Sequence, residues 1–314
     1  MLGYIRHCNK PRRQPSRRRA APGRDCEALG AASKHFASVG SIYMPELPEV
    51  ETTRRGIAPH AVGKRIARLT VYDRRLRWPV PVDLAKHVEG RTIDALERRS
   101  KYLLFRLGKD TLVFHFGMTG SLRVYGQAPP RKPHDHVDLV LDDGTLLRYH
   151  DPRRFGAMLL VPGSGSDHPL LAHLGPEPFE PAFDAGYLWQ ALRPRTAAIK
   201  LALMENSVVV GVGNIYANEA LFRAGIRPTT PARKVSRPRI AHLVDAVRVV
   251  LASAIDDGGS TLRDYVDAGG RPGQAQLGYF VYGREGAPCR VCATTIRMRR
   301  LGARASYYCP ACQR

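Results

Sequence analysis

Four cysteines near the end of the chain constrain its fold more than any other feature. Two Cys-x-x-Cys pairs, Cys289 with Cys292 and Cys309 with Cys312, are separated by sixteen residues. Pairs at this spacing bring four thiolates into a tetrahedron, the geometry of a structural zinc ribbon. Because four protein ligands leave no open position, we expect one Zn²⁺ that stabilises a hairpin and takes no part in catalysis. Free or redox-active cysteines are the alternative.

The segment between the two pairs is basic, and so is the rest of the chain. It contains Arg297, Arg299, Arg300 and Arg304. The 314 residues include 49 Lys and Arg against 28 Asp and Glu, a net charge of +21, of which residues 1–43 carry +7. This charge predicts a polyanionic partner, most often nucleic acid. A solvated basic surface is the alternative.

Length and composition predict two or three domains with real cores, since 44% of the residues are hydrophobic. No apolar run reaches the about 18 residues of a membrane span, so we expect no membrane partner. The cysteines do not form a scattered disulfide framework and no secretory segment precedes the body, which favours a reducing cytoplasm. Nothing in the sequence requires a dimer, and we expect a monomer.

Residues 1–43 are rich in Arg, Pro, Gly and Ala and lack sustained periodicity, so we expect them to be disordered. They resemble an organelle transit peptide in composition, or they are an upstream extension with Met44 as the true initiator. We favour the misassigned start. Either interpretation puts the functional N-terminus at Pro45.

Residues 44–172 are expected to form a β-sandwich or barrel that follows an N-terminal helix. Apolar residues alternate in 67–71, and 102–107 and 111–116 are short apolar runs. Residues 136–149 read as a hairpin with an Asp-Gly turn. Short strands separated by turns are typical of such folds.

Helical periodicity begins after a linker at residues 168–181 that is rich in Pro and Gly. We expect helices at residues 187–192, 197–205, 215–224 and 238–256. Residues 173–278 would form a helical domain that ends in a glycine-rich loop at 258–276, and residues 279–314 the zinc ribbon. The predicted fold class is therefore α+β.

The stretch Met44-Pro45-Glu46-Leu47-Pro48-Glu49 reads as a helix start, because proline and acidic residues suit the first turn. If Met44 is removed, Pro45 carries a secondary amine, and the adjacent helix N-terminus disfavours its protonation. Such an amine can form a Schiff base with an aldehyde-like carbon. Glu46 beside it could donate and accept protons. A capped amphipathic helix without a catalytic role remains the other interpretation.

Gly211-Val-Gly213-Asn214 precedes a predicted helix and is a second candidate site. Glycines let a ligand approach the backbone, and Asn214 suits an N-cap position that leaves helix-end N–H groups for phosphate. A lone Gly-x-Gly motif is weak, and it does not follow a strand, so a dinucleotide site is not expected. In a basic protein, we expect this motif to hold the backbone of a nucleic acid.

Three further groups fit a nucleic-acid enzyme but have ordinary structural interpretations. Lys101 lies at the mouth of an apolar strand, where its amine could meet a phosphate or act as an acid or base, or could simply end the strand. Residues 114–120 and 150–156 each combine a turn glycine, a large apolar residue and a cation. Such side chains can fill the gap left by an extruded base, or can be turn and core residues.

Together these motifs resemble the formamidopyrimidine-DNA glycosylase family from Met44 to Gln313. The matching strings are Met-Pro-Glu-Leu-Pro-Glu-Val-Glu at 44–51, Arg-Arg-Ser-Lys-Tyr-Leu at 98–103, His-Asp-His-Val-Asp at 134–138, Asp-Pro-Arg-Arg-Phe-Gly at 151–156, Gly-Val-Gly-Asn-Ile-Tyr at 211–216 and Val-Tyr-Gly-Arg-Glu-Gly-x-Pro-Cys at 281–289. The resemblance implies a β-sandwich with an N-terminal helix, a helix-two-turn-helix domain and a zinc ribbon. Damaged double-stranded DNA would lie between the two halves.

The resemblance also implies residue roles. Pro45 would attack C1′ of the damaged nucleoside and Glu46 would be the acid and base at the sugar. Lys101 would assist the first strand elimination and Arg304 the second. The implied DNA contacts and void-filling residues are His134, Arg153, Arg195, Asn214, Met118 and Phe155. Relatives often carry lysine where this chain has Arg195, which keeps the charge. The glycine-rich loop would close over the flipped base.

The implied activity is that of a bifunctional DNA glycosylase and AP lyase of base-excision repair. It would remove oxidised purines such as 8-oxoguanine and formamidopyrimidines and cut the strand by β,δ-elimination. As written, Pro45 is internal, and a tertiary amide is no nucleophile, so the chain with residues 1–43 should bind DNA without cutting it. The alternatives are an endonuclease VIII-like enzyme for oxidised pyrimidines, a non-catalytic zinc-ribbon regulator and, less expected, a structural protein of the ribosomal kind.

Overall fold

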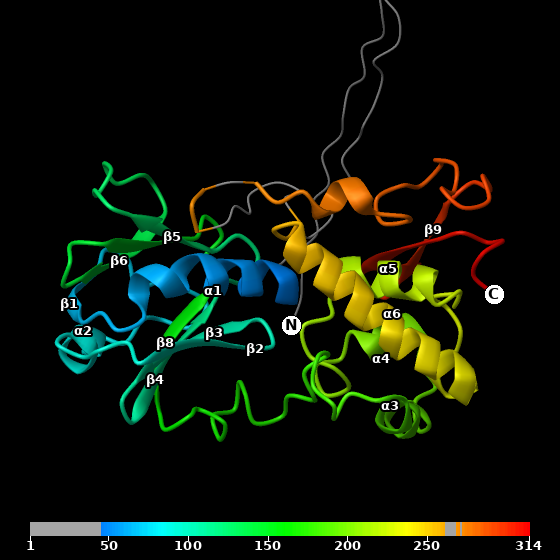
Figure 1. Ribbon diagram of the computed structural model, residues 1–314, viewed down its shortest axis with the longest axis horizontal. Helices are drawn as coiled ribbons and strands as arrows, with labels where there is room; N and C mark the ends of the chain where they lie inside the picture. The colour runs from blue at the N-terminus through cyan, green and yellow to red at the C-terminus, as the bar shows by residue number, and fades with distance from the viewer. Residues whose placement is uncertain (1–44, 261–267, 271) are drawn as a thin grey trace, which may run out of the picture. The chain divides into compact units, whose positions relative to one another are not determined.

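The computed structural model describes residues 45–260, 268–270 and 272–314, which belong to one compact unit (Figure 1). The disorder expected for residues 1–43 falls outside the described residues, as does part of the glycine-rich loop. Within the described ranges, no helix combines the length and the apolar character needed to cross a membrane.

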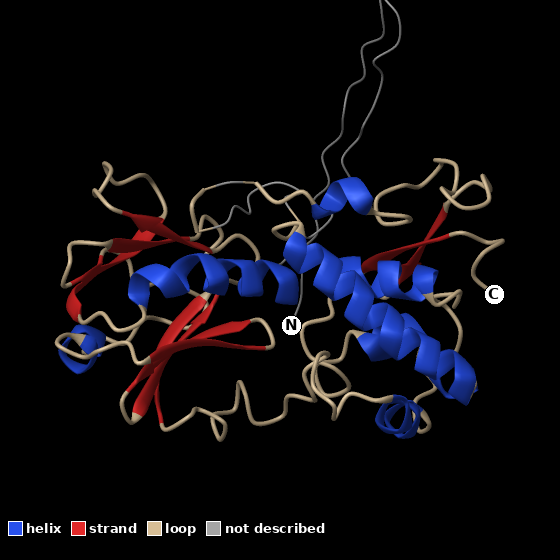
Figure 2. Ribbon diagram, in the orientation of Figure 1, coloured by secondary structure: helices blue, strands red, loops and turns tan. Residues whose placement is uncertain are grey.

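A β-sandwich follows the first helix, as the alternating and short apolar runs predict (Figure 2). One antiparallel sheet has the strand order β1-β6-β7-β5 and the other β2-β3-β4-β8. Apolar side chains from both sheets, among them Leu139 and Phe105, share one core. The strands are β1 (Ile66–Val71), β2 (Ala95–Arg99), β3 (Tyr102–Leu107), β4 (Asp110–His115), β5 (Ser121–Tyr125), β6 (Asp135–Leu141), β7 (Leu146–His150) and β8 (Ala157–Pro162).

Two local features of the sandwich follow directly from the sequence. The Asp-Gly turn joins β6 to β7, with Gly144 at φ +86° and Leu141 N donating to Thr145 O over 2.8 Å. β3 and β4 are apolar on both faces because their outer face is also covered. Leu104 and Val113 pack there against Leu171.

Helix α1 (Leu47–Ala61) connects two cores. It begins one residue before Pro48, with Glu46 as N-cap, and Glu49 accepts a hydrogen bond of 2.8 Å from Glu46 N. Val50 and Ile57 pack in the sandwich core. Leu47, at the start of the same helix, packs in the core of the helical half, and its N–H donates to Gly211 O.

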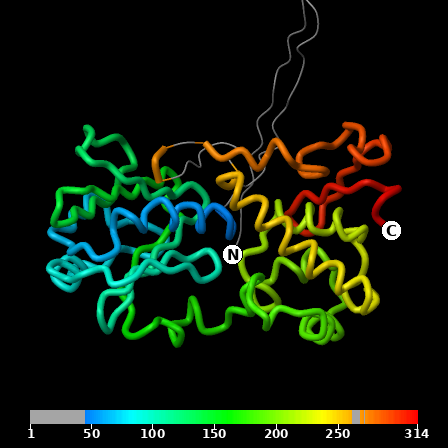
Figure 3. Tube along the Cα trace, viewed as in Figure 1, coloured from blue at the N-terminus to red at the C-terminus, as the bar shows by residue number. Residues whose placement is uncertain are grey.

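The helical half contains each helix that the sequence predicts, with the second one shorter than expected. α1 and α6 are in contact, and a short helix, α2 (Leu84–Val88), lies beside β1 (Figure 3). The elements of the helical half are α3 (Ala185–Leu192), α4 (Ile199–Leu203), α5 (Asn214–Arg223), the 3₁₀ turn η1 (Ala232–Lys234), α6 (Arg237–Asp256) and the 3₁₀ turn η2 (Ala275–Gly278).

The linker between β8 and α3 has no helix or strand, as predicted, and side chains hold it on both sides. Glu177 accepts hydrogen bonds from Arg98 Nη1, Arg99 Nη1 and Ser100 N of the sandwich. Arg248 of α6 donates to Pro178 O. The linker therefore joins the turn that carries Lys101 to the helical half.

The C-terminal module is a two-stranded antiparallel hairpin, β9 (Arg297–Leu301) and β10 (Arg304–Tyr308). Its small core contains Val281, Ile296, Cys289 and Cys309 together with Phe222 of α5. The module thus rests on α5, the helix that follows the Gly211–Asn214 motif.

Candidate active site

Glu46 is held by the N-terminus of α5. Its carboxylate accepts hydrogen bonds from Gly213 N at 2.8 Å, Ile215 N at 3.1 Å and Tyr216 N at 3.5 Å, and the residue is buried. The expectation that these N–H groups bind phosphate is therefore wrong for this structure, because a carboxylate of the chain itself takes the position that suits an anion. The N-cap is Gly213, and Asn214 is the first helical residue.

The two glycines of the motif make room for α1. A Cβ on Gly213 would lie 2.1 Å from Glu46 Cδ, and one on Gly211 would lie 2.5 Å from Leu47 Cβ. Gly211 also has φ +77°, which favours glycine. The close approach predicted for a ligand is thus made by residues at the start of α1.

Burial changes the protonation of Glu46 and Lys101. Loss of water raises the pKa of Glu46 to about 7, although the positive charge of Lys101 and the surrounding N–H donors oppose the shift. Burial also lowers the pKa of the Lys101 amine, while Glu46 acts in the opposite direction. A carboxyl group that titrates near neutrality is suited to both proton donation and proton acceptance.

A cavity of about 200 Å³ brings four of the predicted site residues together. Glu46, Lys101, Asn214 and Arg304 line it, from α1, the β2–β3 turn, α5 and β10. Pro45 directly precedes Glu46 and is buried. The site is therefore assembled from four parts of the chain that are far apart in sequence.

A second cavity of about 660 Å³ contains the residues predicted to fill a gap in DNA. Met118, Arg153 and Phe155 line it together with His115, and Arg304 lines both cavities. The Arg153 guanidinium lies over the Phe155 ring at 4.9 Å. Burial lowers the pKa of His115 to about 4, so this imidazole is neutral at pH 7.

His134 and Arg195 line neither cavity. His134 is exposed and has φ +72°, and its carbonyl accepts a hydrogen bond from Asp151 N. Arg195 Nε lies 3.1 Å from Glu205 Oε2, so its guanidinium is already paired within the protein.

Two further buried ionisable residues, Lys200 and Glu49, lie outside the lining of the smaller cavity. Lys200 of α4 is fully buried, donates to Ala305 O at 2.6 Å and to Ser306 Oγ at 2.8 Å, and burial lowers its pKa to about 7. Glu49 accepts from Tyr216 Oη at 2.6 Å and from Ser260 N at 2.8 Å. The signal for Lys200 is a lone lysine within the apolar run of α4.

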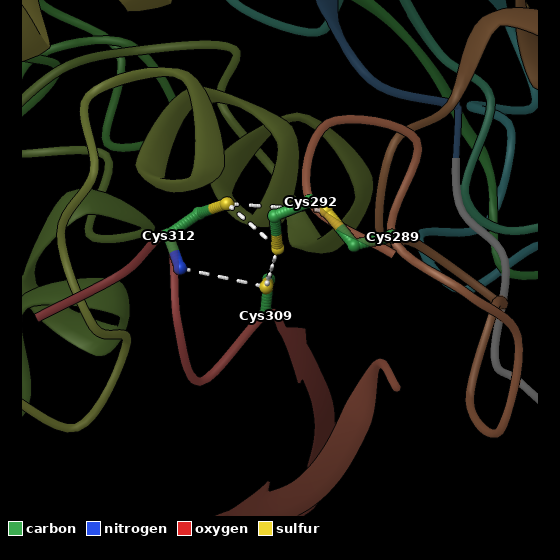
Figure 4. A group of neighbouring side chains, drawn as sticks. All are labelled: Cys289, Cys292, Cys309 and Cys312. Carbon is green, nitrogen blue, oxygen red and sulfur yellow. Dashed lines mark hydrogen bonds between the residues drawn. The ribbon is translucent and has the colours of Figure 1, made fainter. Parts of the chain in front are cut away.

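The four cysteines meet as the spacing predicts. Their ligand atoms lie within 4.8 Å of one another, with Sγ–Sγ separations of 3.4 Å (Cys292–Cys312), 3.5 Å (Cys292–Cys309) and 3.9 Å (Cys289–Cys312), and Figure 4 shows the side chains converging. Zn–S bonds of about 2.3 Å in a tetrahedron require sulfur separations of roughly 3.8 Å. The donor set therefore fits one structural Zn²⁺, which would stabilise the hairpin that carries Arg304.

Family models match most of the chain. Residues 44–158 match the formamidopyrimidine-DNA glycosylase N-terminal domain, residues 174–266 the formamidopyrimidine-DNA glycosylase H2TH domain, and residues 286–314 the zinc finger found in FPG and IleRS. The chain is 53% identical over 271 residues to a formamidopyrimidine-DNA glycosylase of Hahella chejuensis, and 55% identical over 275 residues to one of Stutzerimonas stutzeri. Each match covers 86% of this chain and 100% of the relative.

Solved structures show the same fold. The MutM (FPG) protein of Thermus thermophilus superposes with a TM-score of 0.77 at 42% identity, covering 86% of this chain and 98% of that one. Lactococcus lactis Fpg in complex with DNA containing an abasic site superposes with a TM-score of 0.79 at 34% identity. This match covers 86% of this chain and 99% of the L. lactis chain. On these grounds, together with the geometry of the site, the chain belongs to the formamidopyrimidine-DNA glycosylase family.

Proposed function

We propose that this DNA glycosylase of base-excision repair removes oxidised purines from duplex DNA through a Schiff base on Pro45 and then cuts the strand on both sides. The observation that carries the proposal is the cavity beside Pro45, where Glu46, Lys101, Asn214 and Arg304 meet. A carboxyl group with a pKa of about 7 next to a potential amine nucleophile suits attack on a sugar carbon.

The first step is attack by the Pro45 nitrogen on C1′. The new N–C1′ bond forms and the bond from C1′ to the damaged base breaks, and the base leaves with the proton that the Pro45 nitrogen gives up. Glu46, neutral below pH 7, supplies a proton at the sugar as the ring opens. The product is an iminium between Pro45 and C1′, which withdraws electrons from C2′.

The strand is then cut by two eliminations. The C2′ proton is lost and the 3′-phosphate leaves with its electron pair. A proton is next lost from C4′ and the 5′-phosphate leaves. Lys101 assists the first departure and Arg304 the second, since both cations line the cavity. No step passes through Zn²⁺.

Oxidised purines are the favoured substrate class. A mutant of L. lactis Fpg, 35% identical to this chain, has been solved with DNA containing Fapy-dG. The same protein has also been solved with DNA containing an oxidised pyrimidine, so the two lesion classes should be compared directly. We propose that Met118, Arg153 and Phe155 fill the gap left by the flipped base, and that His134, Arg195 and Asn214 contact the backbone. The cavity that Met118, Arg153 and Phe155 line together supports the gap-filling role of these three residues.

The decisive test is borohydride trapping with a duplex that contains one 8-oxoguanine opposite cytosine. A chain that begins at Pro45 is expected to form a covalent adduct that maps to Pro45, because only a free secondary amine can attack C1′. The 314-residue chain, in which that nitrogen is an amide, is expected to retard the DNA without forming an adduct. The relative from Hahella chejuensis matches 86% of this chain over its whole length, so the comparison itself motivates testing the shorter form.

An adduct with the longer chain would show that another residue is the nucleophile. DNA binding without an adduct from either form, on purine and pyrimidine lesions alike, would leave a DNA-binding regulator as the better description. A stronger adduct with 5-hydroxycytosine than with 8-oxoguanine would move the substrate class to oxidised pyrimidines.

Gly213→Ala is expected to lower single-turnover base excision by about 100-fold, because the added methyl group displaces the Glu46 carboxyl group by more than an ångström. The matched control is Gly186→Ala on α3, where the added Cβ meets only Asp184 Oδ1 at 3.3 Å and Oδ2 at 4.0 Å. Excision at the wild-type rate by Gly213→Ala would contradict the proposed position of Glu46.

We also propose that the enzyme acts as a monomer in the bacterial cytoplasm, with domains at 44–172, 173–278 and 279–314. A cavity built from elements of one chain supports the first point, and thiolate ligands that must stay reduced support the second. Separate cores for the sandwich, the helices and the ribbon support the boundaries.

A further inference from the structure

The hairpin that carries Arg304 is held along its outer edge by two buried side chains. β10 pairs with β9 along one edge, with Arg304 opposite Leu301 and Tyr307 opposite Met298. On the other edge, Lys200 Nζ donates to Ala305 O, and Asn218 Oδ1 accepts from Tyr307 N at 2.8 Å. These side chains occupy positions that a third strand would otherwise take.

Asn218 links this edge to the start of α5. The residue is fully buried, and its Nδ2 donates to Asn214 O at 2.6 Å while its Oδ1 faces Tyr307 N. One contact needs a donor and the other needs an acceptor, so a single orientation of the amide satisfies both. Asn218 therefore connects a residue that lines the smaller cavity to the strand that presents Arg304.

Arg304 lies at the end of β10 next to the hairpin turn. It lines the smaller cavity with Glu46 and Lys101, and it also lines the larger cavity with Met118 and Phe155. Tyr307 is three residues away, about 10 Å along an extended strand. A rotation or slip of the hairpin would therefore change which cavity the guanidinium faces.

We propose that Asn218 is a positioning residue for the second strand cleavage, because its amide fixes Tyr307 and so directs Arg304 toward the cavity that holds Glu46. The inference rests on the role proposed above for Arg304. In the step concerned, a proton leaves C4′ and the C5′–O bond breaks, with the electron pair leaving on the 5′-phosphate. The cation of Arg304 must face that oxygen as negative charge develops there.

The test uses the chain that begins at Pro45, with zinc bound, and a 5′-labelled duplex with one abasic site. The label separates the 3′-unsaturated aldehyde left by the first elimination from the 3′-phosphate left by the second. Asn218→Ala is expected to slow the second elimination about tenfold while the first changes less than about twofold. The unsaturated aldehyde therefore accumulates.

Two further variants separate positioning from a general loss of stability. Asn218→Asp in its neutral form offers the same donor and acceptor, so it is expected to keep more of the second elimination than Asn218→Ala. Arg248→Ala removes hydrogen bonds to Pro178 O and Phe183 O, away from the hairpin, and is expected to keep the wild-type product ratio. Thermal denaturation and zinc content show whether each variant is folded.

Arg304→Ala and the double variant Arg304→Ala/Asn218→Ala complete the experiment. If Asn218 acts through Arg304, the double variant is no slower in the second elimination than Arg304→Ala alone. A wild-type product ratio for Asn218→Ala, or equal slowing of both eliminations, overturns the inference. If Arg304→Ala itself leaves the second elimination intact, the proposed role of Arg304 is wrong, and the inference fails for that separate reason.

Discussion

Replacing Glu46 by glutamine is expected to slow base excision strongly and at the same time to stabilise the folded protein above neutral pH. Loss of the proton donor and acceptor should lower single-turnover excision by about 10²–10⁴-fold. The stabilisation follows from burial, which raises the pKa of Glu46 from 4.5 to about 7. The folded state therefore holds a proton that the unfolded state releases, and stability falls as the pH rises from about 4.5 to about 7.

The change in the free energy of unfolding follows from the size of the Glu46 pKa shift. The wild-type penalty is small at pH 5 and reaches roughly 3 kcal/mol at pH 8, so Glu46→Gln should gain stability relative to wild type between these values. Thermal and urea denaturation at both pH values would measure the difference on the 314-residue chain, in which Pro45 N carries no charge. A gain that is the same at pH 5 and pH 8 would show that Glu46 does not titrate in this range.

Removing the zinc is expected to cost the enzyme its second strand cleavage and most of its DNA affinity. Structural zinc sites of this kind contribute on the order of 10 kcal/mol to the folding of small modules. Ile296, Val281 and the buried cysteines form a core too small to replace that contribution. Without the metal, β9 and β10 should unfold and Arg304 should leave both cavities.

The measurement combines chelation with Cys309→Ser, which removes one buried ligand. The chelated protein and the Cys309→Ser variant should both lose protection of the zinc-ribbon amides against hydrogen exchange. The amides of β3 and β4 should stay protected in both. Added zinc should restore the chelated protein but not the variant. Full protection of the hairpin after chelation would show that the hairpin folds without the metal.

Local patterns in the sequence were sufficient to predict the order of the elements and the cluster of four cysteines. The cysteine spacing predicted a converging thiolate set, and the change from strand to helix periodicity predicted the order of sandwich and helices. The Asp-Gly turn and the start of α1 follow from preferences of one or two residues. Each of these features depends on residues close together in the chain, which is why a sequence pattern reveals it.

The features that the sequence did not reveal depend on contacts between residues that are far apart in the chain. The start of α5 was expected to bind phosphate, and it binds the carboxylate of Glu46, 167 residues away. Leu47 packs in the helical core, whereas Val50 of the same helix packs in the sandwich core. A helix does begin at Asn214, but nothing in the local motif shows which anion reaches the helix end.

The sequence by itself determined the zinc ligands, the α+β order of elements and the Pro45–Glu46 pair, because these depend on covalent neighbours and on period. Only the tertiary structure decided that Glu46 titrates near neutrality, that Lys200 is buried against the hairpin, and that Asn218 links α5 to β10. Those properties depend on which groups exclude water from one another, and these groups come from distant segments of the chain.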